Sequence, residues 1–344
     1  MNLNKSIIAA SLSVAGLMSI SLPAVADIYG GSSLEISELR IGFTNAAGAD
    51  ASASVTVNSF NFGSTNTAVL NGAGVITTAS CSNTVACGAG PVLDAAAANA
   101  PGSVGVTRIN NQVSGGDASL TWFGIGAGTN WSNSDSVIYT SEITSSGANP
   151  TKTAQIAEAK ITSALSAQAN SELTSNTSLT FNFTIAPNAT NFSLSFLADP
   201  DMQARILNDL GISQSTMAVS VNLSKDGTLT QFLWTPDGTA TDNCLEAGGV
   251  TCTESSDLVN LNVSLSTSTN NTAANHSFGP NAAGGSLFGI SASGLTAGNW
   301  TLSLRGFVST NLTRQAVPEP GVLALLGIAL AGMGIAGRRR TLKK

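Results

Sequence analysis

The sequence is poor in charge and in aromatic side chains. Charged residues make up 10% of the 344 residues, against about a quarter in an average soluble domain, and aromatic residues make up 5%. Only 14 basic residues face 20 acidic ones, and the body of the chain has no basic stretch, which excludes a nucleic-acid-binding protein. Intrinsic disorder is excluded as well, because 42% of the residues are hydrophobic and the net charge of −6 is modest.

Histidine is almost absent, which limits the catalytic chemistry open to the chain. The single His276, in a polar stretch that predicts a solvated loop, could serve one Ser-His-Asp triad, but the G-x-S-x-G motif is missing. Carboxylate pairs that could hydrolyse glycosides occur at Asp199 with Asp201 and at Asp237 with Asp242. Acidic residues in such turns usually cap helices or face solvent, so we expect no catalytic residue and no enzyme activity.

Motifs for cofactors and metals are missing too. The chain has neither a phosphate loop nor a dinucleotide fingerprint, so no cofactor is expected. The oxygen-rich stretch with Asp237, Asp242 and Asn243 could hold Ca²⁺, but it lacks the spacing of a calcium loop. Zinc is disfavoured because His276 is the sole nitrogen ligand, and we predict no metal site.

The four cysteines fall into two close pairs, Cys81 with Cys87 and Cys244 with Cys252. Such pairs form local disulfides in an oxidising compartment. Each bond would close a small loop, which corresponds to about 2–3 kcal/mol of stabilisation. We predict both disulfides.

The N-terminal residues 1–26 have the pattern of a secretory signal peptide. Lys5 gives a positive start, and an apolar stretch without charge follows. Ala24 and Ala26 provide the small residues that a signal peptidase needs, so cleavage would leave Asp27 as the new N-terminus. The chain is therefore expected to be exported across the inner membrane.

The C-terminal residues 317–344 combine three elements in order. Pro318, Glu319 and Pro320 precede an apolar run over residues 321–336, which is followed by a basic cluster. The run would form a helix of about 24 Å, slightly shorter than the hydrocarbon core of a bilayer. We predict a transmembrane helix whose basic cluster stays in the cytoplasm, since positive charges favour that side. The cluster contains Arg338, Arg339, Arg340, Lys343 and Lys344.

This order of tripeptide, short helix and basic tail resembles the PEP-CTERM sorting signal of Gram-negative bacteria. The resemblance implies that exosortase, a membrane-embedded protease and transpeptidase, recognises Pro318-Glu319-Pro320 and that the tail is a temporary anchor. It also implies a cell-surface or extracellular-polysaccharide context. It covers about a twelfth of the chain and leaves the fold and role of the body open.

The body, residues 27–316, is predicted to be one exported β domain. Apolar residues alternate with polar ones in many short segments, as in an antiparallel β-sandwich of the jelly-roll type. Residues 44–118 are richer in Ala, Gly and Asn, and we expect loops and irregular strands there. The clearest alternations lie at residues 34–43, 179–185, 192–196, 219–223 and 300–307.

Two segments are predicted to be helices packed on this sandwich. Residues 151–172 place Ile156, Ile161 and Leu165 among Ala, Lys, Glu and Gln, which suits an amphipathic helix. Residues 199–210 offer an N-cap aspartate followed by Pro200 in the first turn. The expected fold is therefore mainly β with one or two helices.

The sequence favours a non-enzymatic, exported surface or matrix protein. Its expected partners are signal peptidase, exosortase, the inner membrane and, by the resemblance, extracellular polysaccharide. The alternative is a secreted carbohydrate-binding or carbohydrate-cleaving domain with the same tail, which a row of exposed aromatic residues on one sheet face would favour. A self-assembling surface layer or adhesin has the same composition and also stays open.

Overall fold

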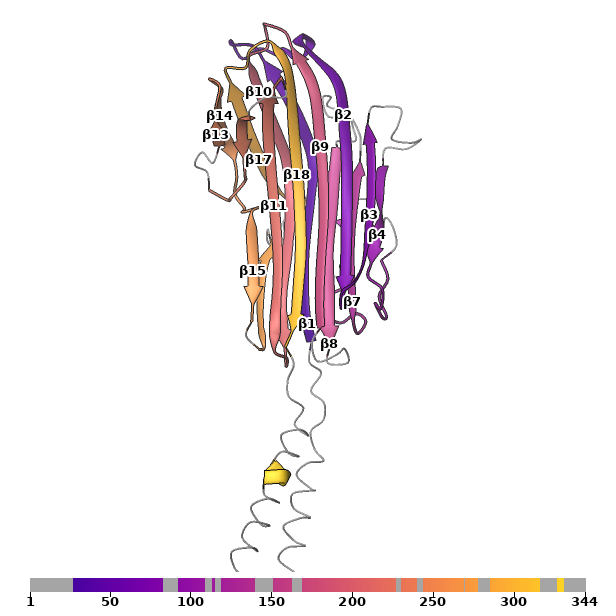
Figure 1. The fold of residues 1–344 in the computed structure, drawn as a ribbon. Coiled ribbons are helices and arrows are strands. Elements are labelled where there is room, and N and C mark those ends of the chain that lie inside the picture. The colour runs from indigo at the N-terminus through magenta and orange to yellow at the C-terminus, as the bar shows by residue number, and fades with distance from the viewer. Residues whose placement is uncertain are drawn as a thin grey trace, which may run out of the picture.

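The body consists of two antiparallel β-sheets that pack face to face (Figure 1). The computed structural model describes residues 27–82, 92–108, 113–114, 119–139, 151–162, 169–226, 230–239, 244–268, 270–277, 285–315 and 327–330. The predicted antiparallel two-sheet architecture is confirmed.

The first sheet, sheet A, has the strand order β14-β17-β10-β1-β8-β7-β4, and β16 also pairs with β10. Its strands are β1 (Asp27–Thr44), β4 (Val92–Asn99), β7 (Trp131–Tyr139), β8 (Thr151–Thr162), β10 (Asn191–Leu207), β14 (Thr251–Ser256), β16 (Thr272–Ser277) and β17 (Ser286–Ser293).

The second sheet, sheet B, has the strand order β13-β12-β11-β18-β9-β2-β3, and β15 also pairs with β11. Its strands are β2 (Val55–Leu70), β3 (Ala73–Ser82), β9 (Ala169–Ile185), β11 (Gly211–Lys225), β12 (Thr230–Trp234), β13 (Cys244–Glu246), β15 (Val263–Thr267) and β18 (Gly298–Arg314). A two-stranded pair, β5 (Val113–Ser114) with β6 (Ser119–Leu120), and a 3-10 turn, η1 (Ser52–Ser54), complete the set.

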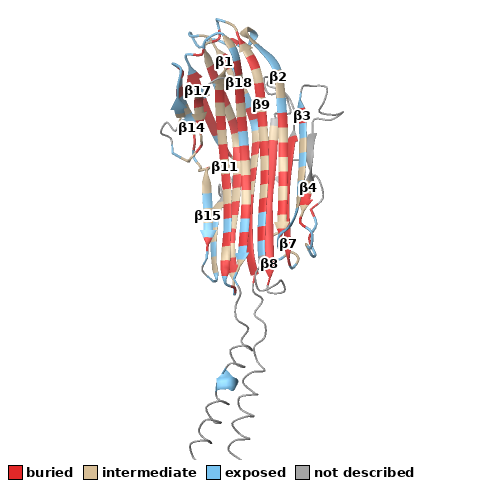
Figure 2. Ribbon diagram, in the orientation of Figure 1, coloured by how far each residue is buried: buried red, intermediate tan, exposed pale blue. Residues whose placement is uncertain are grey.

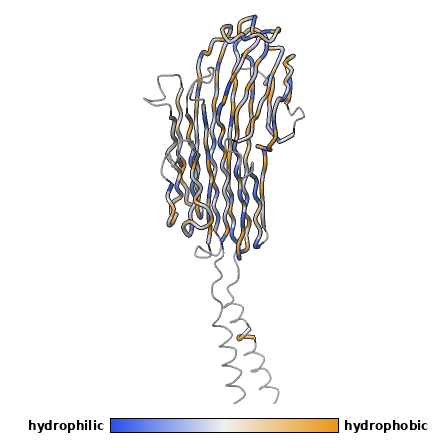
Figure 3. Tube along the Cα trace, turned by 180° about the vertical axis from the view of Figure 1, so that it is seen from behind, coloured by the Kyte–Doolittle hydropathy of each residue, from blue (hydrophilic) through white to orange (hydrophobic). Residues whose placement is uncertain are grey.

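The central strands are long, and buried and less buried residues alternate along them (Figure 2). The 17 residues of β18 extend over about 56 Å. Seen from behind, the same alternation of hydrophobic and hydrophilic residues runs along the strands (Figure 3). One face of each sheet therefore forms the core, as the period of two requires.

A β-bulge explains why the apolar residues of β1 change from even to odd positions. Leu34 and Ile36 face the core, and so do Leu39 and Phe43. The register with β10 shifts between Ser37 and Arg40, where Glu38 has a φ of 51°. The extra residue keeps both halves of the strand facing inward.

The core differs between its two ends. Toward the end of the sandwich where β1 finishes, it is filled by aromatic rings such as Phe43, Phe183 and Phe192. Toward the opposite end, short hydroxyl side chains of one sheet donate to backbone carbonyls of the other. Ser213 Oγ donates to the Tyr29 carbonyl at 2.7 Å, and Thr310 Oγ1 donates to the Ala157 carbonyl at 2.9 Å. Because these side chains are small, the two sheets lie close together there.

A third layer covers part of the outer face of sheet A. Among the described residues of 100–130, Leu120, Trp122 and Val106 pack on outward-facing side chains of the sheet. They bury Ile156 on β8 and Tyr29 on β1. Strand β8 is therefore buried on both faces.

The two predicted helices are wrong. Residues 151–162 form β8 and residues 169–172 begin β9. Strand β8 is buried on both faces, so it has apolar residues at odd and even positions and no clean alternation. Residues 199–207 continue β10, where Met202 and Ile206 follow the strand period and not a helical one. The described residues of these two segments contain no helix.

Pro200 lies inside β10 without breaking it, because the neighbouring strand is interrupted at that point. On this side β10 pairs with β17 through Phe192–Ala198 and with β16 through Asp201–Ile206. Pro200 falls in the gap between the two ladders, where no N–H has to be donated. Strand β11 has a similar gap between its ladders with β12 and β15.

The prediction of loops and irregular strands over residues 44–118 is also wrong in large part. Strands β2 and β3 form a long hairpin closed by Asn71 and Gly72, which both have positive φ. Such a turn matches the twist of the two strands. Small polar residues on the outer face of the hairpin had hidden its strand character.

The ends of the body lie together at one end of the sandwich (Figure 1). Asp27 pairs with Leu207, and Arg314 pairs with Gly211 across the same β10–β11 turn. Arg314 also forms an ion pair with Asp209 of this turn, with an N–O distance of 2.8 Å.

Candidate functional site

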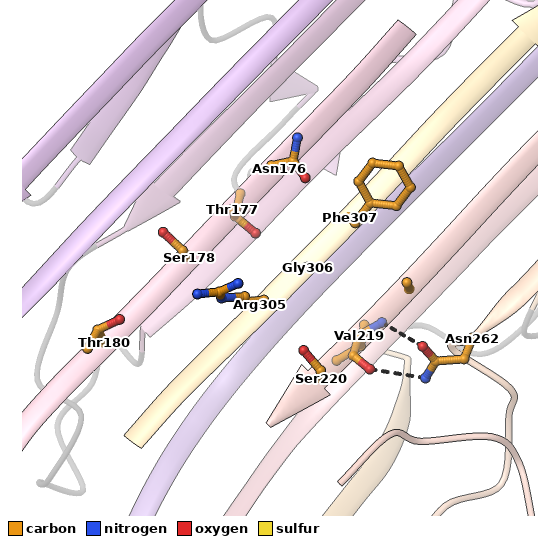
Figure 4. Close-up of a pocket in the computed structure, with 11 residues that line it drawn as sticks. Asn176, Thr177, Ser178, Thr180, Val219, Ser220, Asn262, Arg305, Gly306 and Phe307 are labelled. Carbon is orange, nitrogen blue, oxygen red and sulfur yellow. Dashed lines mark hydrogen bonds between the residues drawn. The ribbon is translucent and has the colours of Figure 1, made fainter. Parts of the chain in front are cut away.

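A hollow of the described surface lies on the outer face of sheet B (Figure 4). Its volume is about 460 Å³. A second hollow of about 220 Å³ adjoins it and shares the wall at residues 176–178. Together they form one depression across β11, β18, β9, β2 and β3, which we call the transverse groove. Its outward-facing side chains come from Asn176, Ser178, Thr180, Ser220, Asn262, Arg305 and Phe307, continuing to Gly63, Thr65, Thr78 and Ser80.

Strand register explains why the surface is hollow here. Gly63, Ser178 and Arg305 lie side by side in one row across β2, β9 and β18, and Ser220 continues the row on β11. Gly63 has no side chain at its outward position, and the serines are short. The row is therefore low at β2, β9 and β11, the Arg305 side chain rises from it at β18, and Phe307 and Asn176 of the next row stand beside it (Figure 4).

Asn262 closes the groove at β11 by acting in place of a strand. The Val219 N–H donates to Asn262 Oδ1 at 3.2 Å, and Asn262 Nδ2 donates to the Val219 carbonyl at 3.1 Å (Figure 4). The same amide nitrogen also donates to the Pro236 carbonyl at 2.7 Å. These bonds fill the gap between the β12 and β15 ladders and hold this wall of the groove rigid.

Arg305 gives the groove its only charged side chain. It is exposed, and none of the ion pairs among the described residues includes it. The acidic residue on the outward positions of β9, Glu172, lies six residues from Ser178, or about 20 Å along the strand. The groove therefore combines hydroxyl and amide groups, one aromatic ring and one guanidinium group.

A pair of carboxyl groups lies behind this wall. Trp234 Nε1 donates to Glu254 Oε1 at 2.8 Å, and the backbone N–H groups of Asp237 and Gly238 donate to Asp257 Oδ2 at 2.7 and 3.0 Å. The pKa of Glu254 is raised to about 7, chiefly by burial; the Trp234 hydrogen bond opposes this rise, and the nearby Asp257 and Asp237 support it. Burial also raises the pKa of Asp257, which is 1% exposed. One proton shared between Glu254 and Asp257 relieves the repulsion.

A second buried cluster holds the covering layer on sheet A. Glu158 accepts hydrogen bonds from the Tyr29 hydroxyl at 2.7 Å and from the Phe123 and Gly124 N–H groups at 3.1 and 2.7 Å. Arg108 forms an ion pair with it at 3.2 Å. Burial is the main cause that raises the pKa of Glu158 and lowers that of Arg108. Both carboxylate oxygens are occupied by protein donors, so this cluster is suited to fixing the fold rather than to binding substrate.

The sequence-predicted catalytic and metal candidates do not converge. Asp199 and Asp201 lie on β10 and not in a turn; burial raises the pKa of both, that of Asp201 to about 6. His276 lies on β16 and not in a loop, and its Nε2 is 2.9 Å from the Asn260 carbonyl oxygen. Asp237 is described, whereas Asp242 and Asn243 lie outside the described residues.

Metal ligands and aromatic residues give no further site. Within the described residues, no three His, Cys, Asp or Glu side chains come close enough to hold a metal ion. Trp131, Trp234 and Trp300 are buried, while Trp122 is part of the covering layer and lies over Gly31. They do not form the exposed row that a sugar-binding face of tryptophans would need.

The cysteine prediction is confirmed for one pair. Cys244 and Cys252 form a disulfide with a Cα–Cα distance of 6.4 Å, which joins β13 of sheet B to β14 of sheet A. Cys81 is disulfide-bonded, and its predicted partner Cys87 lies outside the described residues.

The predicted processing residues lie outside the part of the chain that the structure describes. They comprise Ala24, Ala26, Pro318, Glu319, Pro320, Arg338, Arg339 and Arg340. Of the predicted transmembrane run only residues 327–330 are described, and they are helical. No helix within the described residues is long and apolar enough to span a bilayer.

The fold is thus an antiparallel β-sandwich with a polar, solvent-facing depression on sheet B. Residues 316–340 match the family described as the PEP-CTERM protein-sorting motif. The chain thus carries a PEP-CTERM sorting motif at these residues, and this motif supports exosortase-dependent sorting of an exported protein, with a membrane-associated precursor.

Comparisons of the whole chain with other proteins identify no relative that indicates the function of the body. No curated protein matches the chain. Structures of the Gt and Gx strains of infectious bursal disease virus are each 10% identical to it, with TM-scores of 0.09. The first alignment covers 93% of this chain and 90% of the viral one, and the second covers 91% and 87%. At these TM-scores the viral structures carry no argument about fold or function.

Sequence reasoning did not find the transverse groove. Its residues are spread from Gly63 to Phe307 and become neighbours only through strand pairing. The one local sign of the groove in the sequence was Arg305, which stands among outward-facing Ser, Thr and Asn residues of β18.

Proposed function

We propose that this protein is a non-enzymatic surface or extracellular-matrix protein that exosortase processes at Pro318-Glu319-Pro320. The sorting motif over residues 316–340 is the observation that carries the proposal. The motif begins two residues after β18 ends at Arg314, so the sandwich is joined directly to its processing site.

The architecture fits a body that stands on a membrane before it is processed. Both ends of the sandwich lie together, and the strands extend about 56 Å from that end. Basic residues of the tail stay in the cytoplasm under the positive-inside rule. After removal of both ends, 8 basic and 19 acidic residues remain, which is a net charge of −11. This charge favours solubility and disfavours binding to anionic lipid.

A role without catalysis is supported by the state of the acid and base groups. Glu158 is fully occupied by protein donors, and Glu254 and Asp257 face each other behind the groove wall. The ring of His276 is bonded to a backbone carbonyl. None of these groups faces the transverse groove as an acid or base would.

The proposal is tested by intact mass and fractionation of the native protein in its host, with and without exosortase. We expect loss of the residues after about Pro320 only in the strain that has exosortase, and any extra mass would identify an attached group. A full-length chain in the inner membrane of both strains would overturn the proposal.

A carbohydrate-binding role is a second candidate, and the transverse groove favours it. Sugars are bound by hydroxyl and amide side chains together with an aromatic ring, and the groove presents Ser178, Thr180, Asn176 and Phe307. This role is compatible with surface sorting, since no residue that lines the groove belongs to the motif at residues 316–340.

A further inference from the structure

We propose that the transverse groove binds a linear, carboxylate-bearing polysaccharide, with Arg305 pairing to a sugar carboxylate and Phe307 contacting a sugar ring. This inference rests on the carbohydrate-binding candidate and names its ligand class and its central residue.

The shape of the groove suits an extended chain. It crosses five neighbouring strands, which at about 4.8 Å between strands gives a length of about 19 Å. Its lowest row contains Gly63, Ser178 and Ser220. A polymer can therefore lie across the strands along this row and continue beyond β3, whereas Asn262 limits it at β11.

The lining suits sugar hydroxyl groups. Ser178, Thr180 and Ser220 can each donate and accept a hydrogen bond, and Asn176 offers both an amide donor and a carbonyl acceptor. These side chains stand on long strands with a fixed register, so little conformational entropy is lost when a ligand binds. The Phe307 ring stands beside the row and is only partly buried, which leaves it available to a sugar C–H face (Figure 4).

Charge selects the anionic class of sugar. Arg305 is exposed and belongs to none of the ion pairs of the described residues, and its planar guanidinium group matches a carboxylate in a two-bond geometry. The body as a whole is acidic, so an anionic chain is repelled elsewhere and held at this residue. A single cation is too little for a nucleic acid, whose binding requires several phosphate contacts.

The test uses the mature protein with both disulfides, titrated with alginate as a linear polyuronate and with dextran as a neutral chain. We expect alginate to bind and dextran to bind at least about tenfold more weakly, as the loss of one charge-assisted hydrogen-bonded pair implies. Arg305→Gln should weaken alginate binding by a similar factor and remove its salt dependence. Phe307→Ala should weaken both sugars.

Arg205→Gln is the matched control. Arg205 lies on β10 of sheet A, opposite Tyr29 of β1 and away from the groove. This variant therefore loses the same charge as Arg305→Gln and leaves the groove unchanged. The melting temperature of each variant verifies that it is folded. Equal effects of the two arginine substitutions, equal affinity for the two polysaccharides, or no binding of alginate would each overturn the proposal. Occupation of the groove by a second copy of the chain would overturn the proposal as well. It would be seen as self-association that Arg305→Gln abolishes, in a protein that does not bind alginate.

The outcome is separable from that of the sorting experiment. Exosortase-dependent loss of the tail does not require an intact groove, and alginate binding by the purified body does not require the tail. Failure of one therefore leaves the other standing.

Discussion

At the scale of single residues, Glu254 and Asp257 show how the fold changes an acid that the sequence presents as ordinary. Both lie near strand ends in a polar stretch, and nothing in their spacing predicts that they meet. Pairing of β14 with β17 and the loop that follows β12 bring them together behind the groove. Their shared proton follows from burial, which a linear sequence does not reveal.

Stability should therefore rise as the solution is acidified from pH 8 to pH 5. Glu254 is protonated in the folded protein up to a pKa of about 7, whereas the unfolded chain loses this proton near the ordinary value of 4.5. Its contribution to stability is fully present below pH 4.5 and is lost as the pH rises through 7. Melting temperatures at pH 5, 6, 7 and 8 measure the effect.

Glu254→Gln should flatten this pH profile and raise the melting temperature at pH 8, because the amide is neutral at every pH. Glu172→Gln is the control, since it removes one negative charge from the outer face of β9. If the melting temperatures of both variants depend on pH as steeply as that of the wild type, the proton on Glu254 is not the cause of the pH dependence.

Arg108 and Glu158 should be strongly coupled in stability. Removal of one member leaves a buried charge without its partner, so Arg108→Met and Glu158→Gln should each cost about 3–5 kcal/mol. The double variant should cost clearly less than the sum, because no charge remains uncompensated. Urea unfolding of the four proteins gives the coupling energy; additive losses would contradict this account.

At the scale of elements, the sequence predicted strands well where one face meets the core and the other meets water. Residues 179–185, 219–223 and 300–307, which lie in β9, β11 and β18, were predicted as strands from their alternation. Strand β8 is covered on both faces and was predicted to be a helix. The first part of β10 was predicted as a strand, but its second part, which contains a proline at a gap in the neighbouring ladder, was predicted to be a helix. Burial by a distant segment and the partner of a strand are tertiary properties that local periodicity does not contain.

Asn262 should behave as part of the sheet although it lies outside the named strands. Asn262→Ala leaves the backbone groups of Val219 without their partners, and we expect a loss of about 1–3 kcal/mol. Asn222→Ala, on the same strand as Val219, serves as control, because it removes only one side-chain hydrogen bond, from Asn222 to Thr230 on β12. Equal losses in chemical unfolding would show that Asn262 does not replace a strand.

At the scale of the whole molecule, the prediction of export rested on the two ends and the prediction of fold on the body. The C-terminal motif was found from its residues, and the family comparison agrees with it. The groove could not be found in this way, because its walls come from strands separated by more than 200 residues. The groove thus depends on the topology of the strands, whereas the sorting motif is a short linear signal.

Glu319→Ala should block processing while leaving the body folded. The precursor would remain in the inner membrane and keep its tail, which fractionation and intact mass detect. Thr341→Ala, in the tail beyond the motif, is expected to be processed normally. Normal processing of Glu319→Ala would show that the tripeptide is not what the enzyme reads.

Strand β18 has a mechanical consequence. It carries Arg305 and Phe307, and it ends at Arg314, directly before the sorting motif. A pull between a bound polymer and the membrane would thus pass along about 23 Å of one strand, without crossing the rest of the body. Because β9 and β11 pair with β18 along its whole length, this load shears two ladders at once instead of unzipping them one bond at a time. In the precursor, the strand that carries the proposed ligand-binding residues would thus also connect the body to the membrane.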